Sequence, residues 1–364
     1  MSKLIDHISN VFSQIRRKAA YNALAKPYTK FSLKLLREIA QQEPDKNIII
    51  SPMSVAVALA LVYNGAEGDT KDAMSRVLEL DGLDRDTINA ANAALLAELE
   101  HLDPKIDLTM TNKIEVDKQA AKPRFLQIIQ ECYKAEIADN GQPDEIKITN
   151  KIKFKGQWTD KFNKHSTRDE PFTLLNGEKK PCSMMSSPRQ DWAYYRHEEF
   201  RFHMAKVPYG NKKTSLCIFL PSKSITVYDF LEDFTPDNWR KWFGGMSDTD
   251  GYIKLPRFEV DYAISLEQTL KTLGMGIVFD QSQTDFSAMY SFPAWIKHVL
   301  HKAKIDVDEE GTVAEAETTI RFGALIAPPE KIEFFKMVAD YPFIYAIVDN
   351  QTEMPLFLGI TVDP

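Results

Sequence analysis

The chain has 364 residues, of which 44% are hydrophobic and 27% are charged, and its net charge at pH 7 is −7. This size and composition predict a soluble protein with a sizeable core, built as one large domain or as about two or three smaller ones. The acidic balance and the lack of a basic run argue against a nucleic-acid partner, and no apolar run approaches the length of a membrane span.

The three cysteines predict no disulfide framework. Cys132, Cys182 and Cys217 lie far apart, form no CxxC pair and leave one thiol over in any pairing scheme. We therefore expect reduced core residues.

The first residues predict an amphipathic helix. Apolar residues recur at helical spacing from Leu4 to Ile15, and Arg16-Arg17-Lys18 follow. Because polar residues interrupt this run, it is not a secretory signal peptide, which predicts a cytoplasmic protein and leaves an extracellular location open. Residues 1–28 are expected to form an N-terminal helical extension that Pro27 ends, and residues 29–364 the main domain. Such a helix usually docks on its own domain, and a partner-binding or membrane-surface role is the alternative.

Helical and strand patterns then alternate without a βαβ rhythm. Helices are predicted at Phe31–Ala40, at Val55–Tyr63, from Asp69 or Thr70 to Leu80, at Ile88–Leu99, at Pro123–Tyr133, and from Ser265, where Gln268 completes a capping box. Strands are predicted at Asn47–Ile50, Leu108–Val116, Ile146–Lys155, around Met184, and at His203–Pro208, Ser215–Leu220 and Tyr252–Val260, with a hairpin of Phe343–Val348 and Leu356–Val362. With no internal repeat and no break in composition, one mixed α+β domain is the predicted architecture.

The segment from Asp308 to Phe322 has the pattern of a strand but the ends of a loop. Thr312, Ala314, Ala316, Thr318, Ile320 and Phe322 are small or apolar, and they alternate with Val313, Glu315, Glu317, Thr319 and Arg321, most of which are polar. This period is typical of a strand with one buried face. Gly311 is a permissive hinge before the run, and Pro328 and Pro329 cannot donate to a ladder after it. The pattern fits a solvated edge strand or linker, or a segment that lies outside a sheet in one state and inside it in another.

No motif for nucleotide binding, nucleophilic hydrolysis or zinc binding is present. There is no GxGxxG after a strand, no P-loop and no GxSxG. His197 does not continue into HExxH, and His298 and His301 have no matching Cys or His pair. We therefore expect no metal site, no cofactor and no enzyme, although a Ser/His/Asp triad stays open because it is assembled in space.

Five stretches of the chain resemble the serpins, a family of serine protease inhibitors that work by loop insertion. They are Asn47–Ser54, Asn150–Trp158, Leu255–Phe258 with Leu270–Gly276, His301–Ala303 running into Glu309–Thr312, and Ala339–Phe343. Each stretch is weak alone, but the five follow the family's order over Phe31–Pro364. The chain is therefore identified as a member of this family.

The resemblance implies a single serpin-type α+β domain with a large central mixed sheet, surrounding helices and an exposed reactive-centre loop. The hinge of that loop corresponds to Glu310, Gly311, Thr312, Val313, Ala314, Glu315 and Ala316. Ser51, Ser54, Asn150 and His301 match the shutter, a polar cluster where the sheet opens, and Trp158 matches the breach at the top of the sheet. Without the resemblance, the same residues would be ordinary helix caps, a hydrogen-bonded core histidine and a core aromatic residue.

Two departures from the family pattern concern the loop and the front of the sheet. The family spacing from the hinge puts the scissile bond between Leu325 and Ile326, whereas counting back from Pro342 ends near Lys331. Between Glu136 and Ile146 there is room only for a turn, where the family has a helix across the front of the central sheet. Its absence either eases insertion, weakens the metastable state or removes inhibition. Glu315 and Glu317 replace the usual alanines on the outward set, where they are expected to be tolerated.

The function that the resemblance implies is suicide-substrate inhibition of a serine protease by a metastable monomer. The protease attacks Leu325, and the loop inserts into the sheet, a conformational change that precedes hydrolysis of the acyl-enzyme. Leu325 suggests a chymotrypsin-, elastase- or subtilisin-like protease with a hydrophobic primary pocket. The alternatives are a non-inhibitory serpin-fold binding or chaperone-like protein and an unrelated soluble enzyme. No heparin-type cofactor site is expected on Ile88–Leu99, which has no Lys or Arg.

Overall fold

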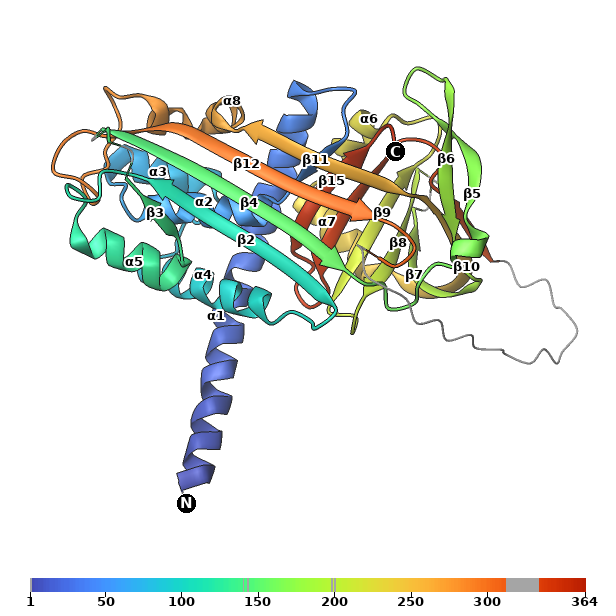
Figure 1. Cartoon of the computed structure of the whole chain (residues 1–364), viewed down its shortest axis with the longest axis horizontal. Helices are drawn as coiled ribbons and strands as arrows, with labels where there is room; N and C mark the ends of the chain where they lie inside the picture. The colour runs from blue at the N-terminus through green and yellow to red at the C-terminus, as the bar shows by residue number, and fades with distance from the viewer. Residues whose placement is uncertain (1, 140, 143, 198, 200, 312–333) are drawn as a thin grey trace, which may run out of the picture.

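The structure is a computed structural model, and it describes residues 2–139, 141–142, 144–197, 199, 201–311 and 334–364 (Figure 1). Its helices are α1 (Ser2–Gln42), α2 (Pro52–Tyr63), α3 (Gly68–Val77), α4 (Arg85–Glu100), α5 (Pro123–Tyr133), α6 (Val227–Leu231), α7 (Pro236–Gly244) and α8 (Glu267–Leu270), with short turns η1 (Lys164–Ser166), η2 (Lys271–Met275) and η3 (Gly276–Phe279). Its strands are β1 (Ile48–Ile50), β2 (Ile106–Glu115), β3 (Glu136–Ala138), β4 (Glu145–Gly156), β5 (Arg168–Thr173), β6 (Lys179–Ser186), β7 (Gln190–Arg196), β8 (Phe202–Tyr209), β9 (Thr214–Pro221), β10 (Ser247–Pro256), β11 (Phe258–Ser265), β12 (Trp295–Val307), β13 (Phe335–Val338), β14 (Phe343–Asp349) and β15 (Pro355–Thr361).

Two sheets form the frame of the molecule. The five-stranded sheet has the order β11-β12-β4-β2-β3, with β12 parallel to β4 and β2 parallel to β3. The ten-stranded sheet has the order β1-β15-β14-β9-β8-β7-β10-β6-β5, and β13 lies beside β10. Helices and both sheets share one hydrophobic core. The predicted single α+β domain with a large mixed sheet is therefore confirmed.

Helix α2 is a core helix because its sequence is apolar on every side. Every residue from Pro52 to Tyr63 is buried. The helix begins at a side-chain cap, in which Oγ of Ser51 accepts a 3.4 Å hydrogen bond from the backbone N–H of Ser54. In Figure 1, α2 and α3 lie behind the five-stranded sheet, so they cover its inner face. The three cysteines are free thiols, as predicted.

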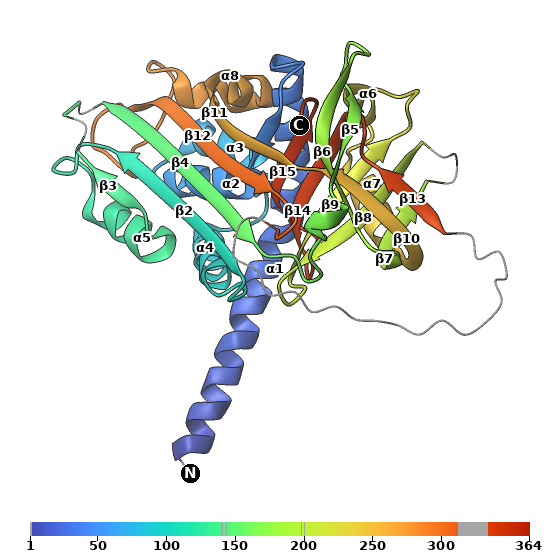
Figure 2. The ribbon, with the colours of Figure 1, turned by 45° about the vertical axis from the view of Figure 1, so that its right-hand side comes forward.

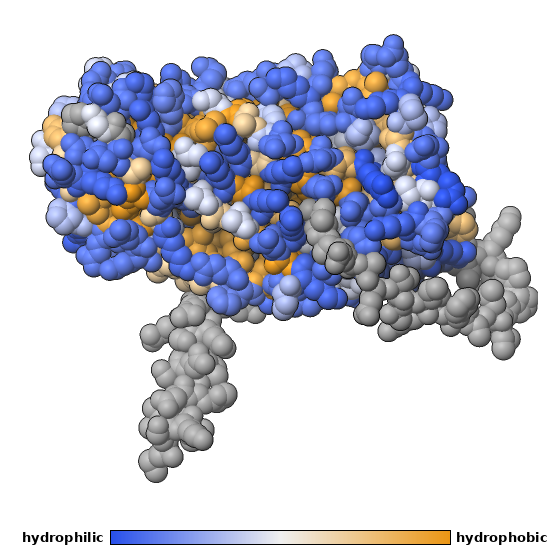
Figure 3. All heavy atoms as spheres, viewed as in Figure 1, coloured by the Kyte–Doolittle hydropathy of each residue, from blue (hydrophilic) through white to orange (hydrophobic). Residues whose placement is uncertain are grey.

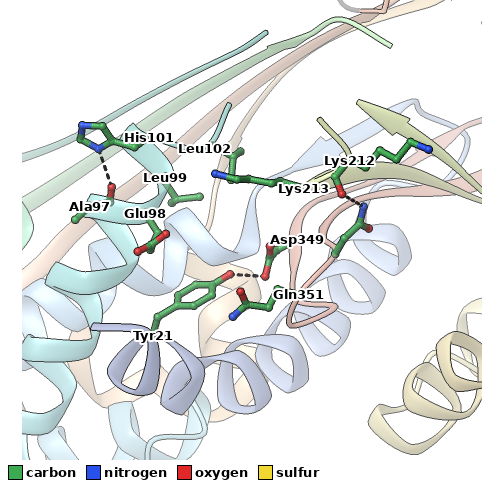
Figure 4. A pocket seen from close by; sticks show the side chains of 11 residues that line it. Tyr21, Ala97, Glu98, Leu99, His101, Leu102, Lys212, Lys213, Asp349 and Gln351 are labelled. Carbon is green, nitrogen blue, oxygen red and sulfur yellow. Dashed lines mark hydrogen bonds between the residues drawn. The ribbon is translucent and has the colours of Figure 1, made fainter. Parts of the chain in front are cut away.

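Helix α1 runs through Pro27 without a break, so the prediction that a helix ends there is wrong. A proline inside a helix costs about 3 kcal/mol, which packing on both sides offsets, because Tyr21, Leu24 and Phe31 are all buried in the core. The hydroxyl of Tyr21 donates a 2.7 Å hydrogen bond to Oδ2 of Asp349 beside a surface cleft (Figure 4). Tyr21 and Leu24 thus pack with the main domain, although they fall in the stretch predicted as an extension. The first turns of α1 project away from the two sheets (Figure 2). No helix in the described part of the chain is long and apolar enough to cross a membrane.

Two predicted boundaries near Arg257 and Ser265 are wrong. The single strand predicted at Tyr252–Val260 is two strands, because β10 ends at Pro256 in the ten-stranded sheet and β11 begins at Phe258 in the five-stranded one. The buried residues are Gly251, Ile253 and Leu255 in β10, and Pro256, Phe258 and Val260 after them. The alternation thus shifts phase between Leu255 and Pro256, and this shift was the available signal of a change of sheet. The predicted capping box does not form, since Ser265 still belongs to β11 and α8 begins at Glu267 without a side-chain cap.

No helix in the described part of the chain lies over the front of the five-stranded sheet (Figure 1). The described residues between β3 and β4 are 139, 141, 142 and 144, and none of them is helical. In Figure 1 the strands β2, β4 and β12 face the viewer with no helix in front of them, so the predicted absence of the family's front helix is confirmed. The outward side chains of β4 are those of Glu145, Lys147, Thr149, Lys151, Lys153 and Lys155. Figure 3 shows hydrophilic and hydrophobic side chains mixed over this face.

Candidate functional site

The candidate site is the seam between the parallel strands β4 and β12 in the middle of the five-stranded sheet. The two strands pair from Glu145 opposite Trp295 to Lys153 opposite Lys304. Beyond that point, residues 154–156 and 305–307 are not paired with each other. The seam is thus closed over most of its length and open at the end from which the chain leaves β12.

The four predicted shutter residues lie together and bridge the seam from behind. Oγ of Ser54 donates a 2.7 Å hydrogen bond to Oδ1 of Asn150 on β4, and the same oxygen lies 2.6 Å from Nδ1 of His301 on β12. Nε2 of His301 accepts a 3.0 Å hydrogen bond from the backbone N–H of Ser51, whose hydroxyl donates to the carbonyl of Leu356 at 2.6 Å. The cluster therefore ties the start of α2 to both strands of the seam and to β15.

The partners of His301 fix its protonation state. Because Nε2 accepts from an N–H group, the ring proton sits on Nδ1 and is donated to Oδ1 of Asn150. Complete burial lowers the pKa of His301 to about 3. The imidazole is accordingly neutral at physiological pH, and it spans the seam as one donor and one acceptor.

Sequence reasoning missed Asn112, a fifth member of the shutter. Asn112 lies opposite Asn150 in the β2–β4 ladder, and its Oδ1 accepts a 2.7 Å hydrogen bond from Nδ2 of Asn150. It is buried, whereas Thr111 beside it faces outward. The available signal was an amide residue at an inward position of a predicted strand, where an apolar residue is usual.

Trp158 lies at the open end of the seam, where the breach was predicted. Its ring is buried and stacks on Tyr209 with the centroids 4.3 Å apart. Its Nε1 donates a 2.8 Å hydrogen bond to the carbonyl of Asp308, and its backbone N–H donates to the carbonyl of Glu310 at 3.0 Å. Trp158 therefore holds the segment that leaves β12 against the end of β4.

Gly311 is enclosed between the two strands of the seam. It forms antiparallel bridges with Gln157 on one side and with Asp308 on the other. Its φ is +124°, and a Cβ atom built on it would lie 2.1 Å from the carbonyl oxygen of Gly156. Only glycine fits this close approach without strain. The last described residue of the hinge thus already occupies the position of a strand between β4 and β12.

Two glutamates anchor the hinge through ion pairs that the sequence did not predict. The buried carboxylate of Glu309 accepts hydrogen bonds of 2.8 and 2.6 Å from Nε and Nη2 of Arg257, and one from Thr167. Glu310 forms an ion pair of 2.6 Å with Lys161. Burial by itself raises the pKa of Glu309, but the hydrogen bonds from Arg257 and Thr167 outweigh it and hold this pKa below its usual value. The base of the loop is therefore held by charged contacts up to Gly311.

The remaining predicted loop residues lie outside the described residues. They are the hinge residues Thr312, Val313, Ala314, Glu315 and Ala316, the proposed bond between Leu325 and Ile326, and the alternative position Lys331. Of the predicted site, the shutter, the breach and the first two hinge residues are described, and they lie along one seam.

A sequence model of the family described as "Serpin (serine protease inhibitor)" matches residues 26–141 and 137–364. The chain belongs to the serpin family. Among its relatives, the leukocyte elastase inhibitor of Bos taurus is 29% identical over 92% of this chain and 98% of that protein. Serpin B6 of Pongo abelii is 27% identical over 93% of this chain and 98% of that protein.

Solved structures of serpins share the fold. The thermophilic serpin tengpin in its native state superposes with a TM-score of 0.82 at 27% identity, covering 95% of this chain and 94% of tengpin. A tumour suppressing serpin superposes with the same TM-score at 21% identity, covering 94% of this chain and all of that one. The family is one of serine protease inhibitors, not of catalytic enzymes.

Proposed function

We propose that this serpin inhibits a serine protease as a suicide substrate. The protease cleaves the bond between Leu325 and Ile326 and becomes esterified to Leu325. The freed loop then enters the seam between β4 and β12 as a new strand, beginning at Thr312. The protease is carried across the molecule before its acyl bond is hydrolysed, so the inhibitor must be kinetically trapped beforehand.

The observation that carries this proposal is the position of Gly311. A parallel strand pair needs no third strand between its members, yet Gly311 is bridged to Gln157 beyond the end of β4 and to Asp308 beyond the end of β12. The seam below it is held by the His301–Asn150 hydrogen bond, by the ion pair of Lys297 on β12 with Glu145 on β4, and by the ladder itself. A strand that continues from Gly311 would separate β4 from β12 progressively, starting at the open end of the seam.

The proposed target has a hydrophobic primary pocket, because that pocket reads the side chain before the scissile bond, here Leu325. Relatives named leukocyte elastase inhibitor support a target of the elastase class. A cut after Lys331 instead would indicate a trypsin-like target. We further propose that the inhibitor acts as a monomer.

A panel of chymotrypsin, elastase, subtilisin and trypsin tests the proposal on a denaturing gel. A band at the summed mass of the chain and the protease, resistant to denaturation, is expected with at least one of the first three. Mass spectrometry of the released C-terminal fragment then locates the bond, and a new N-terminus at Ile326 is expected.

The bare front of the sheet favours a second candidate, a non-inhibitory serpin-fold binding or chaperone-like protein. Without a helix over the seam, either state of the sheet lacks the cover that the family fold normally supplies. This candidate predicts cleavage in the loop without a band at the summed mass. The absence of any cleavage between Gly323 and Lys331 would contradict both candidates.

A further inference from the structure

Two pairs of lysines face each other across the outer side of the seam. On the outward face, Lys151 of β4 lies opposite Lys302 of β12, and Lys153 lies opposite Lys304. We call these four residues the lysine quartet. Neighbouring strands are about 4.8 Å apart, and like charges directly opposite each other destabilise a strand pair. The repulsion therefore acts on the one strand pair that the proposed insertion separates.

Negative charge lies near the Lys153–Lys304 pair, because Asp261 of β11 is opposite Lys304 and Asp306 interacts with both lysines, whereas the Lys151–Lys302 pair has no carboxylate in its row. Lys304 has an ion pair of 2.5 Å with Glu259 on the neighbouring strand β11. In the described part of the chain, no carboxylate lies within ion-pair distance of Lys151, Lys153 or Lys302. The row that contains Lys151 and Lys302 is completed by Thr111 on β2 and Ala263 on β11, so it holds two cations and no anion.

The bridges of Gly311 set a register for any strand that continues from it. Both bridges are antiparallel, so residue numbers on the new strand rise while those of its partners fall. Each residue added after Gly311 therefore lies opposite the residue one position earlier on β4, counted from Gln157, and one position earlier on β12, counted from Asp308. Glu315, four residues after Gly311, falls opposite Lys153 and Lys304. Glu317, six residues after Gly311, falls opposite Lys151 and Lys302. The two registers agree, since these lysines are already opposite each other in the β4–β12 ladder.

The register also puts the glutamates on the same face of the sheet as the lysine quartet. The quartet points outward from the sheet, whereas Ile152 and Ala303 between its members are buried. In the same register Ala316 lies between Ile152 and Ala303, and the alternation puts Glu315 and Glu317 on the outward side. Each glutamate thus falls between two lysines, with a small residue between them where the sheet is packed.

We propose that the lysine quartet is a docking site for an acidic strand, and that its occupant is the segment Glu315–Glu317 of this chain. Insertion replaces two Lys–Lys contacts by two Lys–Glu–Lys rows, so the charges weaken the closed seam and stabilise the occupied one. The inference rests on the proposed function and adds to it a charge code that selects the register. If the lysines serve only to keep the uncovered front of the sheet hydrophilic, the sign of the charge at position 317 has no effect.

The substitution Lys302→Glu separates the two explanations because it acts with opposite sign in the two states. In the intact protein it places opposite charges across the closed seam, so the apparent Tm is expected to rise by about 2 °C or more. In the protein cleaved after Leu325, it places a like charge beside Glu317, so the apparent Tm is expected to fall by a similar amount. Both shifts are expected to shrink in about 1 M salt, where the Debye length is about 3 Å.

A charge swap and a matched control complete the experiment. Glu317→Lys is expected to lower the Tm of the cleaved form, and adding Lys151→Glu with Lys302→Glu is expected to restore it. Thr319→Lys is the control, because the same register puts Thr319 opposite Thr149 and Leu300, which are uncharged. Its cleaved form is expected to keep a Tm close to that of the parent chain.

The outcomes are distinguishable. If cleavage of the parent chain does not raise its Tm, insertion itself fails, and the proposed function falls together with this inference. If cleavage raises the Tm but Lys302→Glu shifts both forms in the same direction, or the charge swap fails to restore the cleaved form, the charge code is overturned and insertion stands.

Discussion

His301 on β12 donates a 2.6 Å hydrogen bond from Nδ1 to Oδ1 of Asn150 on β4. The two residues are direct partners in the parallel ladder of the seam. A strand that enters between β4 and β12 has to break this bond, which otherwise holds the strands together. The same contact therefore contributes to the stability of the closed sheet and opposes its opening.

The first prediction concerns the pH dependence of stability. The pKa of His301 is lowered by burial to about 3, whereas that of an unfolded histidine is about 6.5. Between these values the unfolded chain binds a proton that the folded chain excludes. The contribution of His301 is thus complete above about pH 6.5, and below it the folded-to-unfolded ratio falls by up to about tenfold per pH unit. Apparent Tm measured from pH 5 to 7.5 should show this fall.

The matched variant for this prediction is His301→Gln, which has no group that titrates there. Its Tm should be lower at pH 7.5 because the shutter is disturbed, but it should fall less steeply below pH 6.5. Burial also lowers the pKa of His203, so part of the slope stays in the variant. Parallel curves for the parent and the variant would show that His301 does not titrate on unfolding.

The second prediction concerns Gly311. A Cβ at this position would lie 2.1 Å from the carbonyl oxygen of Gly156, at a φ of +124°. Gly311→Ala should therefore displace the hinge, release Trp158 from its contacts and lower the apparent Tm of the intact protein. Backbone strain alone costs about 1–3 kcal/mol. Gly177→Ala is the control, since it has a φ of +84° and nothing within 4 Å of the added Cβ. Equal Tm losses and unchanged tryptophan fluorescence in both variants would show that Gly311 is not packed tightly between the ends of β4 and β12.

The third prediction tests the alternation of the loop. Thr312 is the first residue that has to enter the sheet with its side chain inward, and burying an unpaired charge there costs several kcal/mol (roughly 3 or more). Thr312→Arg should slow early insertion, so that hydrolysis wins and the protein becomes a substrate. Val313→Arg, one residue further and outward, should do far less. The ratio of complex to cleaved inhibitor on a denaturing gel measures the loss of inhibition. An equal loss in both variants would mean that the inward and outward positions of the loop are not distinguished by insertion into a sheet.

The fourth prediction concerns specificity. Leu325→Arg should shift inhibition towards trypsin-like proteases, because the primary pocket reads this one side chain. Inhibition rates with trypsin and elastase, with the mass of the released fragment, provide the measurement. Lys331→Leu is the matched control and should leave the preference unchanged. A fragment that begins at Ile332 in the parent chain would move the scissile bond to Lys331.

The fifth prediction concerns α1. Removing residues 2–18 keeps the Tyr21–Asp349 hydrogen bond, so the apparent Tm should change little. Removing residues 2–25 also removes Leu24, whose side chain is fully buried, and loss of such a side chain costs about 2–5 kcal/mol. The longer truncation should therefore lower the Tm and shorten the lifetime of the inhibitory state. If both truncations behave like the full chain, α1 before Ala25 is an accessory segment.

Local sequence patterns predicted the elements whose apolar residues form a regular period or a continuous run with clear ends. Helix α5 matches its predicted range, and the hairpin of β14 and β15 and the strands β2 and β4 match within two residues. Helix α5 and the strands β2 and β4 have a regular apolar period, whereas β14 and β15 are continuous buried runs. At Pro27 the local signal failed, because tertiary packing of α1 offsets the proline penalty. Near Arg257 one continuous strand was predicted, although the alternation shifts phase between Leu255 and Pro256.

The site was predictable only where a family motif covered it. Ser51, Ser54, Asn150 and His301 lie together and Trp158 lies at the end of the seam, and their contacts join segments far apart in the sequence. Asn112, Arg257 and the opposition of Lys151 to Lys302 could not be foreseen, because they depend on the register between distant strands. The composition of each strand carries no information about that register.

The structure of the chain cleaved after Leu325 tests the insertion of the loop most directly. The account predicts a new strand between β4 and β12, with Ala316 between Ile152 and Ala303, Glu317 between Lys151 and Lys302, and the His301–Asn150 hydrogen bond broken. A cleaved chain in which β4 and β12 remain paired and His301 still donates to Asn150 would contradict it.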